Sequence, residues 1–353
     1  MVAFQATFLC AEQALIKGDS VTKQMLQRDT ITDPTGATAK KLIVCCLPIA
    51  LISVIMTFAN MIDMLTVNPC IKAAMKGSPH TFDNLLSDKL TTDMLPNFIY
   101  GSYTGLAVTV FGLVPTITAM FGKSILPSLA ESCAKNDKKA MQSGLTKMLI
   151  VTSIIAIPAG MGIAVLSEPI LRFLFGGRET EIQVCIMPMS ILGIAVIFLA
   201  IATPCFAILQ TLGKPHKAII IMLAGGIIKL FLNIILIRQP IINISGAAIS
   251  TLVSEVFICV LSVRSVCKMT DLKPKVSEIF VKPTYAAIMC SVTAILSHET
   301  LTKIAHLQIN HRFVTLFSIG IGSTMYFFCL YLLCETPKNI VNCIFSKKNP
   351  QNP

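Results

Sequence analysis

The stretch LPIALISVIMTFANMIDMLTV, Leu47–Val67, is almost wholly apolar and is long enough to cross a bilayer. A membrane-spanning helix needs about 20 mostly apolar residues. Within this run stand Asn60 and Asp63, three residues apart and therefore on one face of a helix. A carboxylate at the centre of a span costs about 2.5–3.5 kcal/mol on insertion scales, so it normally faces protein or water. The stretch predicts a membrane helix with a buried polar face.

Composition extends this interpretation to the whole chain. Hydrophobic residues make up 54% of the 353 residues, charged residues make up 13%, and the mean hydropathy is +0.74. A soluble domain carries about 25% charged residues. The apolar runs are too long and too uniform for the alternating strands of a membrane barrel, and helices are the other structure that satisfies the backbone in lipid. We therefore expect an all-α polytopic membrane protein.

About eight segments are predicted to span the membrane, and they divide the chain into three parts. The segments are Leu42–Val67, Tyr103–Phe121, Met148–Leu166, Ile186–Leu212, Ala218–Ile237, Ile244–Leu261, Ile279–Ser297 and Phe313–Leu333. Residues 1–41 are predicted to form a cytoplasmic N-terminal linker, residues 42–334 the transmembrane helical domain, and residues 335–353 a cytoplasmic tail.

Local signals predict the breaks between and within these spans. Asn68–Gly101 is expected to be a loop with a short surface helix near Phe82–Leu90, and Glu168–Gly177 an interfacial corner that ends at a Gly-Gly break. Internal prolines are expected to kink helices, and some glycines to mark close helix contacts. The positions are Pro115, Pro158, Pro188 and Pro204 for kinks, and Gly101, Gly105 and Gly225–Gly226 for contacts.

Basic residues predict the orientation. The loops on the N-terminal side of the first span hold 20 of the 29 Lys and Arg residues, and those on the other side hold 8. The excess of basic residues in cytoplasmic loops therefore places both termini in the cytoplasm of a multi-pass cell-membrane protein. The net charge of +11 is explained by topology and by contact with anionic lipid, and we expect no nucleic-acid partner.

Signals for catalysis are missing from the sequence. The 13 cysteines are scattered without a CxxC pair, and no histidine stands at metal-ligand spacing from a cysteine. No stretch resembles a nucleophile elbow, a P-loop or HExxH. We therefore expect a protein that is not an enzyme and has no bound cofactor other than a coupling cation.

Three charged residues stand inside predicted spans. They are Asp63, Lys229 and Glu255, apart from Lys282, which stands near the start of the seventh span. Each has a polar neighbour at helical spacing, since Asn233 follows Lys229 by four positions and Thr251 precedes Glu255 by four. Three helices that each present a polar pair suggest one buried cluster. An ion pair of Lys229 with Asp63 or with Glu255, a cation or proton site, and separate charges facing a cavity all remain open.

The order of the segments resembles a known family of transporters. Four stretches carry the likeness: Leu47–Val67, YGSYTGLAVTVFGLVPTITAMFGKSILPSLAES (Tyr100–Ser132), AILQTLGKPHKA (Ala207–Ala218), and GGIIKLFLNIILI with INISGAAISTLVSE (Gly225–Glu255). They resemble the C-terminal part of the polysaccharide-flippase branch of the multidrug/oligosaccharidyl-lipid/polysaccharide exporter superfamily. Within it, the likeness is to the stage V sporulation protein B family and to MurJ-type lipid II flippases.

The resemblance implies a fold and a function. Such families have fourteen helices in two lobes with two extra helices, and this chain resembles helices seven to fourteen of a truncated or split flippase. The implied substrate is a lipid-linked sugar pyrophosphate, such as a peptidoglycan or spore-cortex precursor. Membrane lipids and a second lobe, or a second copy of the chain, are the implied partners. Rival functions are a drug/cation antiporter of the same superfamily and a membrane scaffold that transports nothing.

The resemblance also implies a cation site. In some MurJ-type relatives, sodium binds to an Asp, an Asn, a second Asp and a Thr. Asp63, Asn233 and Thr251 match the first, second and last of these residues. Ile237 stands where the second Asp is expected, and Lys229 lies one turn before Asn233. A sodium or proton-coupling site at Asp63, Asn233 and Thr251 is therefore predicted, with Lys229 and Glu255 as buried charge partners. A tethered ammonium in place of the ion is the alternative.

Overall fold

Long helices build the part of the chain that is described. The computed structural model describes residues 54, 61–75, 94–135, 137–239, 242–271, 277–305 and 311–333. Residues 61–75 are helical. The later helices are α4 (Leu95–Ser102), η2 (Tyr103–Val108), α5 (Thr109–Phe111), α6 (Leu113–Ala134), α7 (Lys138–Val165), α8 (Ser167–Phe175), α9 (Glu179–Thr211), α10 (Pro215–Leu236), α11 (Ser245–Thr270), η3 (Ser277–Val281), α12 (Lys282–Ala305) and α13 (His311–Leu333). No strand occurs in these ranges, which confirms the all-α fold class.

Seven stretches of the described residues are long and apolar enough to cross a membrane. They are Leu95–Cys133, Lys138–Val165, Glu179–Thr211, Pro215–Leu236, Ser245–Thr270, Ile279–Lys303 and Phe313–Leu332. They correspond to the second to eighth predicted spans. The first predicted span, Leu42–Val67, lies mostly outside the described residues. The N-terminal linker and the C-terminal tail lie outside them entirely, so those domain boundaries stay predictions.

Three predicted helix ends in the first two spans are wrong. The predicted loop Asn68–Gly101 begins too early and ends too late, because the first helix continues to residue 75 and α4 starts at Leu95. The Asn68 amide donates to the Asn97 Oδ1 at 3.0 Å, so polar residues that suggested a loop pair across two helices. The predicted surface helix Phe82–Leu90 lies outside the described residues. The second span does not stop at Phe121, because α6 continues to Ala134 with Pro127 inside it.

The predicted corner after the third span is a short amphipathic helix, α8. Its ninth residue is followed by Gly176 and by Gly177, which has φ of +95° and so favours glycine. Arg172 of α8 donates to Glu168 at 2.9 Å and to Glu179 at 2.6 Å. The hydrogen bond to Glu168 raises the pKa of the Arg172 guanidinium. These ion pairs connect α8 to the first turn of α9.

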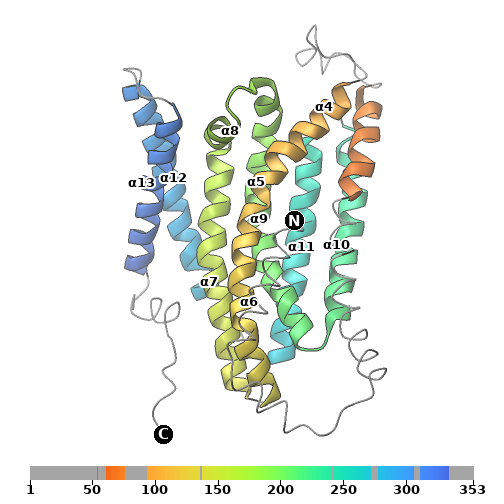
Figure 1. Ribbon diagram of the computed structural model, residues 1–353, viewed down its shortest axis with the longest axis vertical. Coiled ribbons are helices and arrows are strands. Elements are labelled where there is room, and N and C mark those ends of the chain that lie inside the picture. The colour runs from red at the N-terminus through yellow and green to blue at the C-terminus, as the bar shows by residue number, and fades with distance from the viewer. Residues whose placement is uncertain are drawn as a thin grey trace, which may run out of the picture. The chain divides into compact units, whose positions relative to one another are not determined.

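The centre of the bundle is α9, which packs against α6, α7 and α11, while α10 packs mainly on α11 (Figure 1). The helices α12 and α13 pair with each other and contact the rest mainly through α7. At the crossing of α7 and α9 the backbones touch, because a Cβ on Gly193 would lie 2.5 Å from the Ala164 nitrogen. A Cβ on Gly160 would lie 2.6 Å from the Gly193 carbonyl oxygen. Small residues thus allow this crossing.

The proline inside α9 creates a tie to α6. Pro204 has no N–H to donate to the carbonyl of Ala200, four residues earlier. The hydroxyl of Thr118 in α6 donates to that carbonyl at 3.1 Å. One turn later, a Cβ on Gly122 would lie 2.8 Å from the Pro204 Cβ. The two helices therefore meet at the proline, and the freed carbonyl has a partner from the neighbouring helix.

The proline inside α7 creates a similar tie to α13. Pro158 leaves the carbonyl of Ile154 without its helical donor. The hydroxyl of Tyr326 in α13 donates to that carbonyl at 2.9 Å, and Tyr326 is 3% exposed. This bond fixes α13 on α7, which places the pair α12–α13 against the bundle.

The predicted glycine contacts are partly wrong. A Cβ on Gly225 would lie 2.4 Å from the Ile258 side chain, so α10 and α11 do approach closely there. Gly226 is in ordinary contact, since a Cβ would lie 3.6 Å from Ile62. Gly101 and Gly105 would meet nothing within 4 Å. They face open space, because the neighbouring helices of the described residues lie on the other side of α4 and η2.

Candidate functional site

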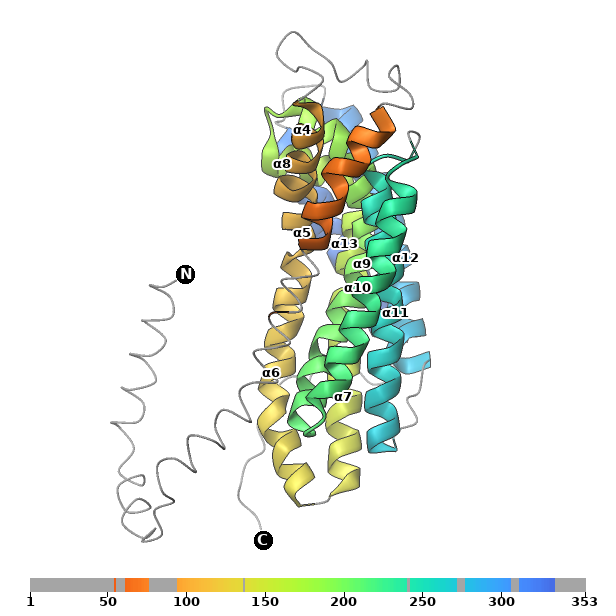
Figure 2. The same ribbon diagram turned by 90° about the vertical axis from the view of Figure 1, so that its right-hand side faces the viewer.

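A buried ion pair joins the first described helix to α10. Asp63 lies on helical segment 61–75, which runs beside the upper part of α10 (Figure 2). The Lys229 ammonium donates to the Asp63 Oδ2 at 2.7 Å. Asp63 is 8% exposed and Lys229 is 9% exposed. The pair satisfies two charges inside apolar helices, where neither could remain alone without a large cost.

An amide one turn further along α10 extends the pair into a network. The Asn233 side chain is fully buried. Its Nδ2 donates to the Asp63 Oδ1 at 2.9 Å and to the Thr66 hydroxyl at 3.0 Å. Its Oδ1 accepts a hydrogen bond from the Ser250 hydroxyl of α11. We call Asp63, Lys229, Asn233, Thr66 and Ser250 the polar network; it connects three helices through satisfied polar atoms.

Thr251 and Tyr103 lie beside the polar network. The Thr251 hydroxyl donates to the Ala247 carbonyl of its own helix at 2.8 Å. Tyr103 comes from η2, is 1% exposed, and lies within hydrogen-bonding reach of Thr251 and close enough to Asp63 for an electrostatic interaction. The backbone widens at η2 into a π-helix, a feature common at functional sites. The widened turn therefore places a phenol next to the network.

Half-buried Glu255 stands nearby, and one of its oxygens has no hydrogen-bond partner among the described residues. The residue lies on α11, one turn after Thr251, and this oxygen, Oε2, is buried. Lys229 interacts with it electrostatically. The ammonium, however, is placed on Asp63. The structure thus places two carboxylates around one lysine and pairs only Asp63 with it.

A small polar recess lies on the outward face of α4 and η2. Its volume is about 230 Å³, and it is lined by Asn97, Phe98, Gly101, Ser102, Gly105, Leu106, Arg178 and Glu181. The face continues along the chain through exposed Thr109, Gly112 and Thr116. The exposed residues at every third or fourth position from Asn97 to Thr116 are therefore glycine, threonine or asparagine, and none has a large side chain. Such a face is unusual for contact with lipid tails.

The sequence decides the family. Residues 98–317, more than half of the chain, match the family model described as Lipid II flippase MurJ. The chain belongs to this family. The resemblance expected from the ordered stretches is confirmed.

Curated relatives of this MurJ-family chain are matched over part of their length. Lipid II flippase MurJ of Bacillus subtilis is 26% identical over 136 residues, 38% of this chain and 25% of the relative. Stage V sporulation protein B of the same organism is 23% identical over 51% of this chain and 34% of its own length. Probable low-salt glycan biosynthesis flippase Agl15 of Haloferax volcanii is 26% identical over 52% of this chain and 38% of its own length. The chain thus spans about a quarter to two fifths of these relatives.

A solved structure shares the fold. A MOP superfamily transporter from Pyrococcus furiosus aligns with a TM-score of 0.51 at 16% identity, over 83% of this chain and 65% of that one. This likeness supports a multi-pass membrane protein. The family model and two of these curated relatives are named as flippases and the solved structure as a transporter, which confirms the prediction that the MurJ-family chain is not an enzyme.

The polar network contains most of the residues predicted from the sequence. Asp63, Lys229 and Asn233 come together, while Thr251 bonds to its own helix and Glu255 lies beside the pair with one oxygen unpartnered among the described residues. Asn60 lies outside the described residues. Sequence reasoning missed Thr66, Ser250 and Tyr103. Thr66 stands three positions after Asp63, on the same helix face, whereas Ser250 stands directly before Thr251 and does not share its face. Hydroxyl groups are too common in helices to mark either residue as part of a network.

The donor set does not fit a sodium ion in this arrangement. Both oxygens of Asp63 accept hydrogen bonds, one from the Lys229 ammonium and one from the Asn233 amide. The Asn233 oxygen accepts from Ser250. A cation needs free oxygen ligands, and here an ammonium takes the place at the carboxylate. The sodium site stays a prediction.

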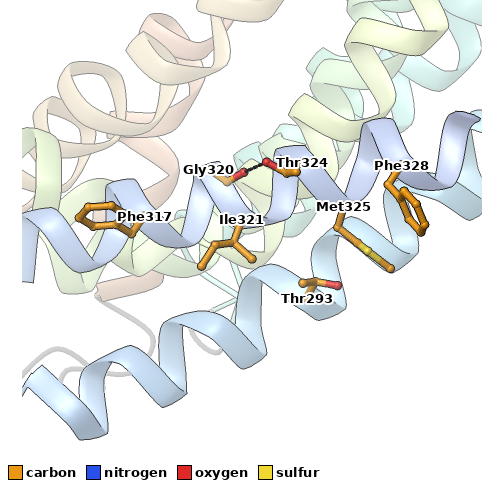
Figure 3. Close-up of a pocket in the computed structure, with 7 residues that line it drawn as sticks. All are labelled: Thr293, Phe317, Gly320, Ile321, Thr324, Met325 and Phe328. Atoms are coloured by element: carbon orange, nitrogen blue, oxygen red, sulfur yellow. Dashed lines mark hydrogen bonds between the residues drawn. The ribbon is translucent and has the colours of Figure 1, made fainter.

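An apolar groove lies between the last two helices (Figure 3). It has a volume of about 570 Å³ and is lined by Thr293, Phe317, Gly320, Ile321, Thr324, Met325 and Phe328. The Thr324 hydroxyl donates to the Gly320 carbonyl of its own helix at 2.9 Å, so its polar atom is satisfied locally. The groove therefore presents aromatic, aliphatic and methyl groups.

Proposed function

We propose that this chain forms part of a flippase that moves lipid-linked sugar pyrophosphates across the cell membrane. The observation that carries the proposal is the match to the MurJ family over residues 98–317. The buried charges support it, because ionisable groups inside spans usually mark a transport pathway or its coupling site. Peptidoglycan and spore-cortex precursors are the substrates we favour, since relatives carry the names lipid II flippase and stage V sporulation protein.

The two faces of the bundle suit the two halves of such a substrate. The headgroup is polar and anionic, and the α4 recess offers backbone glycines, Asn97 and the exposed guanidinium of Arg178. The lipid tail is apolar and stays in the bilayer, where the α12–α13 groove offers aromatic and aliphatic side chains. The headgroup passes along the small polar face while the tail follows in lipid.

A second lobe completes the pathway in this proposal. A pyrophosphate is best bound by several cations, but Lys229 already holds Asp63 at 2.7 Å. Arg178 is the basic residue that lines the α4 recess. We therefore propose that the polar face of α4, η2 and α6 meets a second lobe or a second copy of this chain, which supplies further basic residues. Both termini face the cytoplasm in this arrangement.

A bleaching assay tests the activity. The chain, alone and together with the first lobe of a relative, is reconstituted in liposomes with an undecaprenyl-pyrophosphate disaccharide that carries a fluorophore on the sugar. A membrane-impermeant reductant bleaches the outer leaflet only, so active flipping raises bleaching above the half expected for empty liposomes. Thr109→Leu on the polar face should slow the excess bleaching at least several-fold.

A matched control separates the pathway from general damage. Val260→Leu introduces the same residue, leucine, at an exposed apolar position of α11. It should leave bleaching at the wild-type rate. Bleaching that never exceeds that of empty liposomes, with the chain alone and with the first lobe present, contradicts the proposed function. Equal loss in both variants contradicts the assignment of the pathway to the α4 face.

A further inference from the structure

One oxygen of Glu255 is buried and has no hydrogen-bond partner among the described residues. The residue lies in the middle of α11, within a span of mean hydropathy 2.0. An ionised carboxylate is not stable in such a place without a partner, because the lost hydration is not replaced. Glu255 therefore needs a cation or a proton.

Among the described residues, the cation that interacts with Glu255 is Lys229, on the neighbouring helix. α10 and α11 are in close contact where a Cβ on Gly225 would lie 2.4 Å from Ile258. Lys229 follows Gly225 by one turn, and Glu255 precedes Ile258 by nearly one turn. Because the Asn233–Ser250 bond further along shows that the two helices run antiparallel, both steps lead in the same direction. Lys229 and Glu255 thus lie at the same level of the α10–α11 contact.

The charges of this cluster do not balance if both acids are ionised. Asp63 and Glu255 would carry two negative charges, and Lys229 supplies one positive charge. One proton on the cluster restores neutrality. Asp63 accepts hydrogen bonds at both oxygens, whereas Glu255 has an oxygen with none. Glu255 is the acid with room for that proton.

Few other ionisable groups surround Glu255. On α9, no acid or base lies between Glu181 and the end of the helix except two thiols, and α7 has no ionisable residue between Lys147 and its end. Besides Lys229 on α10, which interacts with Glu255, the ionisable groups near the cluster are Tyr100 and Tyr103, which interact with Asp63 on segment 61–75, and Cys259 on α11, which interacts with Glu255. On α9, Cys185 interacts with Tyr103 and Cys205 with Cys259.

We infer that Glu255 is a proton-binding site that competes with Asp63 for the Lys229 ammonium. While Lys229 is paired with Asp63, Glu255 holds a proton. When Glu255 releases this proton to water, the ammonium turns from Asp63 towards Glu255. The Asp63 carboxylate then keeps only the Asn233 amide as its partner, so helix 61–75 is held to α10 less tightly. The lysine keeps its charge throughout, and the O–H bond of Glu255 is the one covalent bond that forms and breaks. The inference does not depend on which substrate is transported.

Infrared spectroscopy of the full chain in lipid nanodiscs tests the proton. The carbonyl stretch of a protonated carboxyl group is separated from that of a carboxylate. The wild-type protein at neutral pH should show a protonated band that Glu255→Gln removes and that Glu299→Gln, on the exposed face of α12, leaves in place. Asp63→Asn should shrink the band, because Lys229 then pairs with Glu255 and ionises it. An identical spectrum for Glu255→Gln, or a band unchanged by Asp63→Asn, overturns the inference.

A double-mutant cycle tests the competition without measuring transport. Asp63→Asn and Glu255→Gln should each lower the unfolding temperature little, because the other acid remains for Lys229. The double variant should lose several degrees more than the sum of the two, and a double variant that fails to fold while both single variants fold gives the same answer. In a Lys229→Met background the excess loss should vanish. Additive losses with Lys229 present overturn the inference, whatever the flipping assay shows.

Discussion

Asp63 and Lys229 form a buried ion pair, and substituting one or the other should lower the stability of the protein by different amounts. Lys229→Met leaves the Asp63 carboxylate without its cation, and breaking a buried pair from one side costs about 3–5 kcal/mol. Asp63→Asn should cost less, because Glu255 offers the lysine a second acid. Asp63→Asn combined with Lys229→Met should recover most of the loss of Lys229→Met. Thermal unfolding of the purified chain in detergent measures all three.

Activity separates the structural pair from a coupling site. If the pair only fixes helix packing, the stable double variant should flip substrate at a rate close to that of the wild type. If a proton or a cation is coupled here, the double variant should be stable and inactive. Single variants that are both as stable and as active as the wild type would contradict the two readings together.

Two glycines should respond in opposite ways to the same substitution. Gly193→Ala places a methyl group against the Ala164 backbone at 2.5 Å, and overpacking of this kind costs about 1–3 kcal/mol. Gly101→Ala meets nothing within 4 Å, so the gain in helix propensity of up to about 1 kcal/mol should remain. Unfolding temperatures should fall for Gly193→Ala and rise or stay unchanged for Gly101→Ala. The reverse order would contradict the close crossing of α7 and α9.

The residues of the polar network were predictable only in part. The charge of Asp63 and of Lys229 is conspicuous within an apolar run, and Asn233 follows at helical spacing. Hydroxyl groups give no such signal, because most of them in helices donate to a carbonyl three or four residues earlier. Thr104 does so at 2.9 Å, whereas Ser250 also reaches Asn233 on the next helix. Only the docking of the helices distinguishes the two.

At the scale of the helix, the tie between α6 and α9 has a measurable strength. Thr118→Val removes the hydroxyl that donates to the Ala200 carbonyl freed by Pro204. A buried carbonyl left without a donor costs about 1–3 kcal/mol, and the unfolding temperature should fall accordingly. Thr116→Val is the matched control, because its exposed hydroxyl donates to the Gly112 carbonyl of its own helix. It should change the unfolding temperature little.

A second variant shows whether the proline is the cause. Pro204→Ala restores the N–H that α9 lacks, so the Ala200 carbonyl regains a helical donor. In that background Thr118→Val should cost much less than in the wild type. An equal cost in both backgrounds would show that Thr118 stabilises the protein through packing and not through the freed carbonyl.

Hydropathy located the spans but not their ends. Seven spans of the described residues coincide with predicted ones, because about 20 apolar residues are a strong signal. The predicted and observed helix ends differ because polar residues near the membrane surface can pair between helices instead of forming a loop, as Asn68 does with Asn97. The corner at α8 was visible beforehand, since Gly176 and Gly177 stop the helix in any context.

For the molecule as a whole, the orientation in the membrane is open to a direct test. Lys139 lies in the first turn of α7 and Lys303 in the last turn of α12, and both side chains are exposed. The excess of basic residues places the first on the cytoplasmic side and the second outside. In intact cells, a membrane-impermeant maleimide should label Lys303→Cys and spare Lys139→Cys, relative to the labelling of the parental chain measured in parallel.

Permeabilised cells supply the control for this experiment. Both cysteines should be labelled once the reagent can enter the cytoplasm, which shows that each position is reactive. Labelling of Lys139→Cys but not of Lys303→Cys in intact cells would invert the proposed orientation. Labelling of both in intact cells would contradict the odd number of crossings that separates the two positions.

The ion pair between Asp63 and Lys229 links residues that are 166 positions apart along the chain. At about 5–20 residues per second of translation, Asp63 leaves the ribosome roughly 8–30 s before its partner. During that interval the carboxylate has no lysine to meet in the membrane. The helix that carries it is therefore expected to stay beside the translocation channel, or to keep its carboxyl group protonated, until α10 has been synthesised. The pair that holds the folded bundle together thus also sets the order in which its helices can be released into lipid during biogenesis.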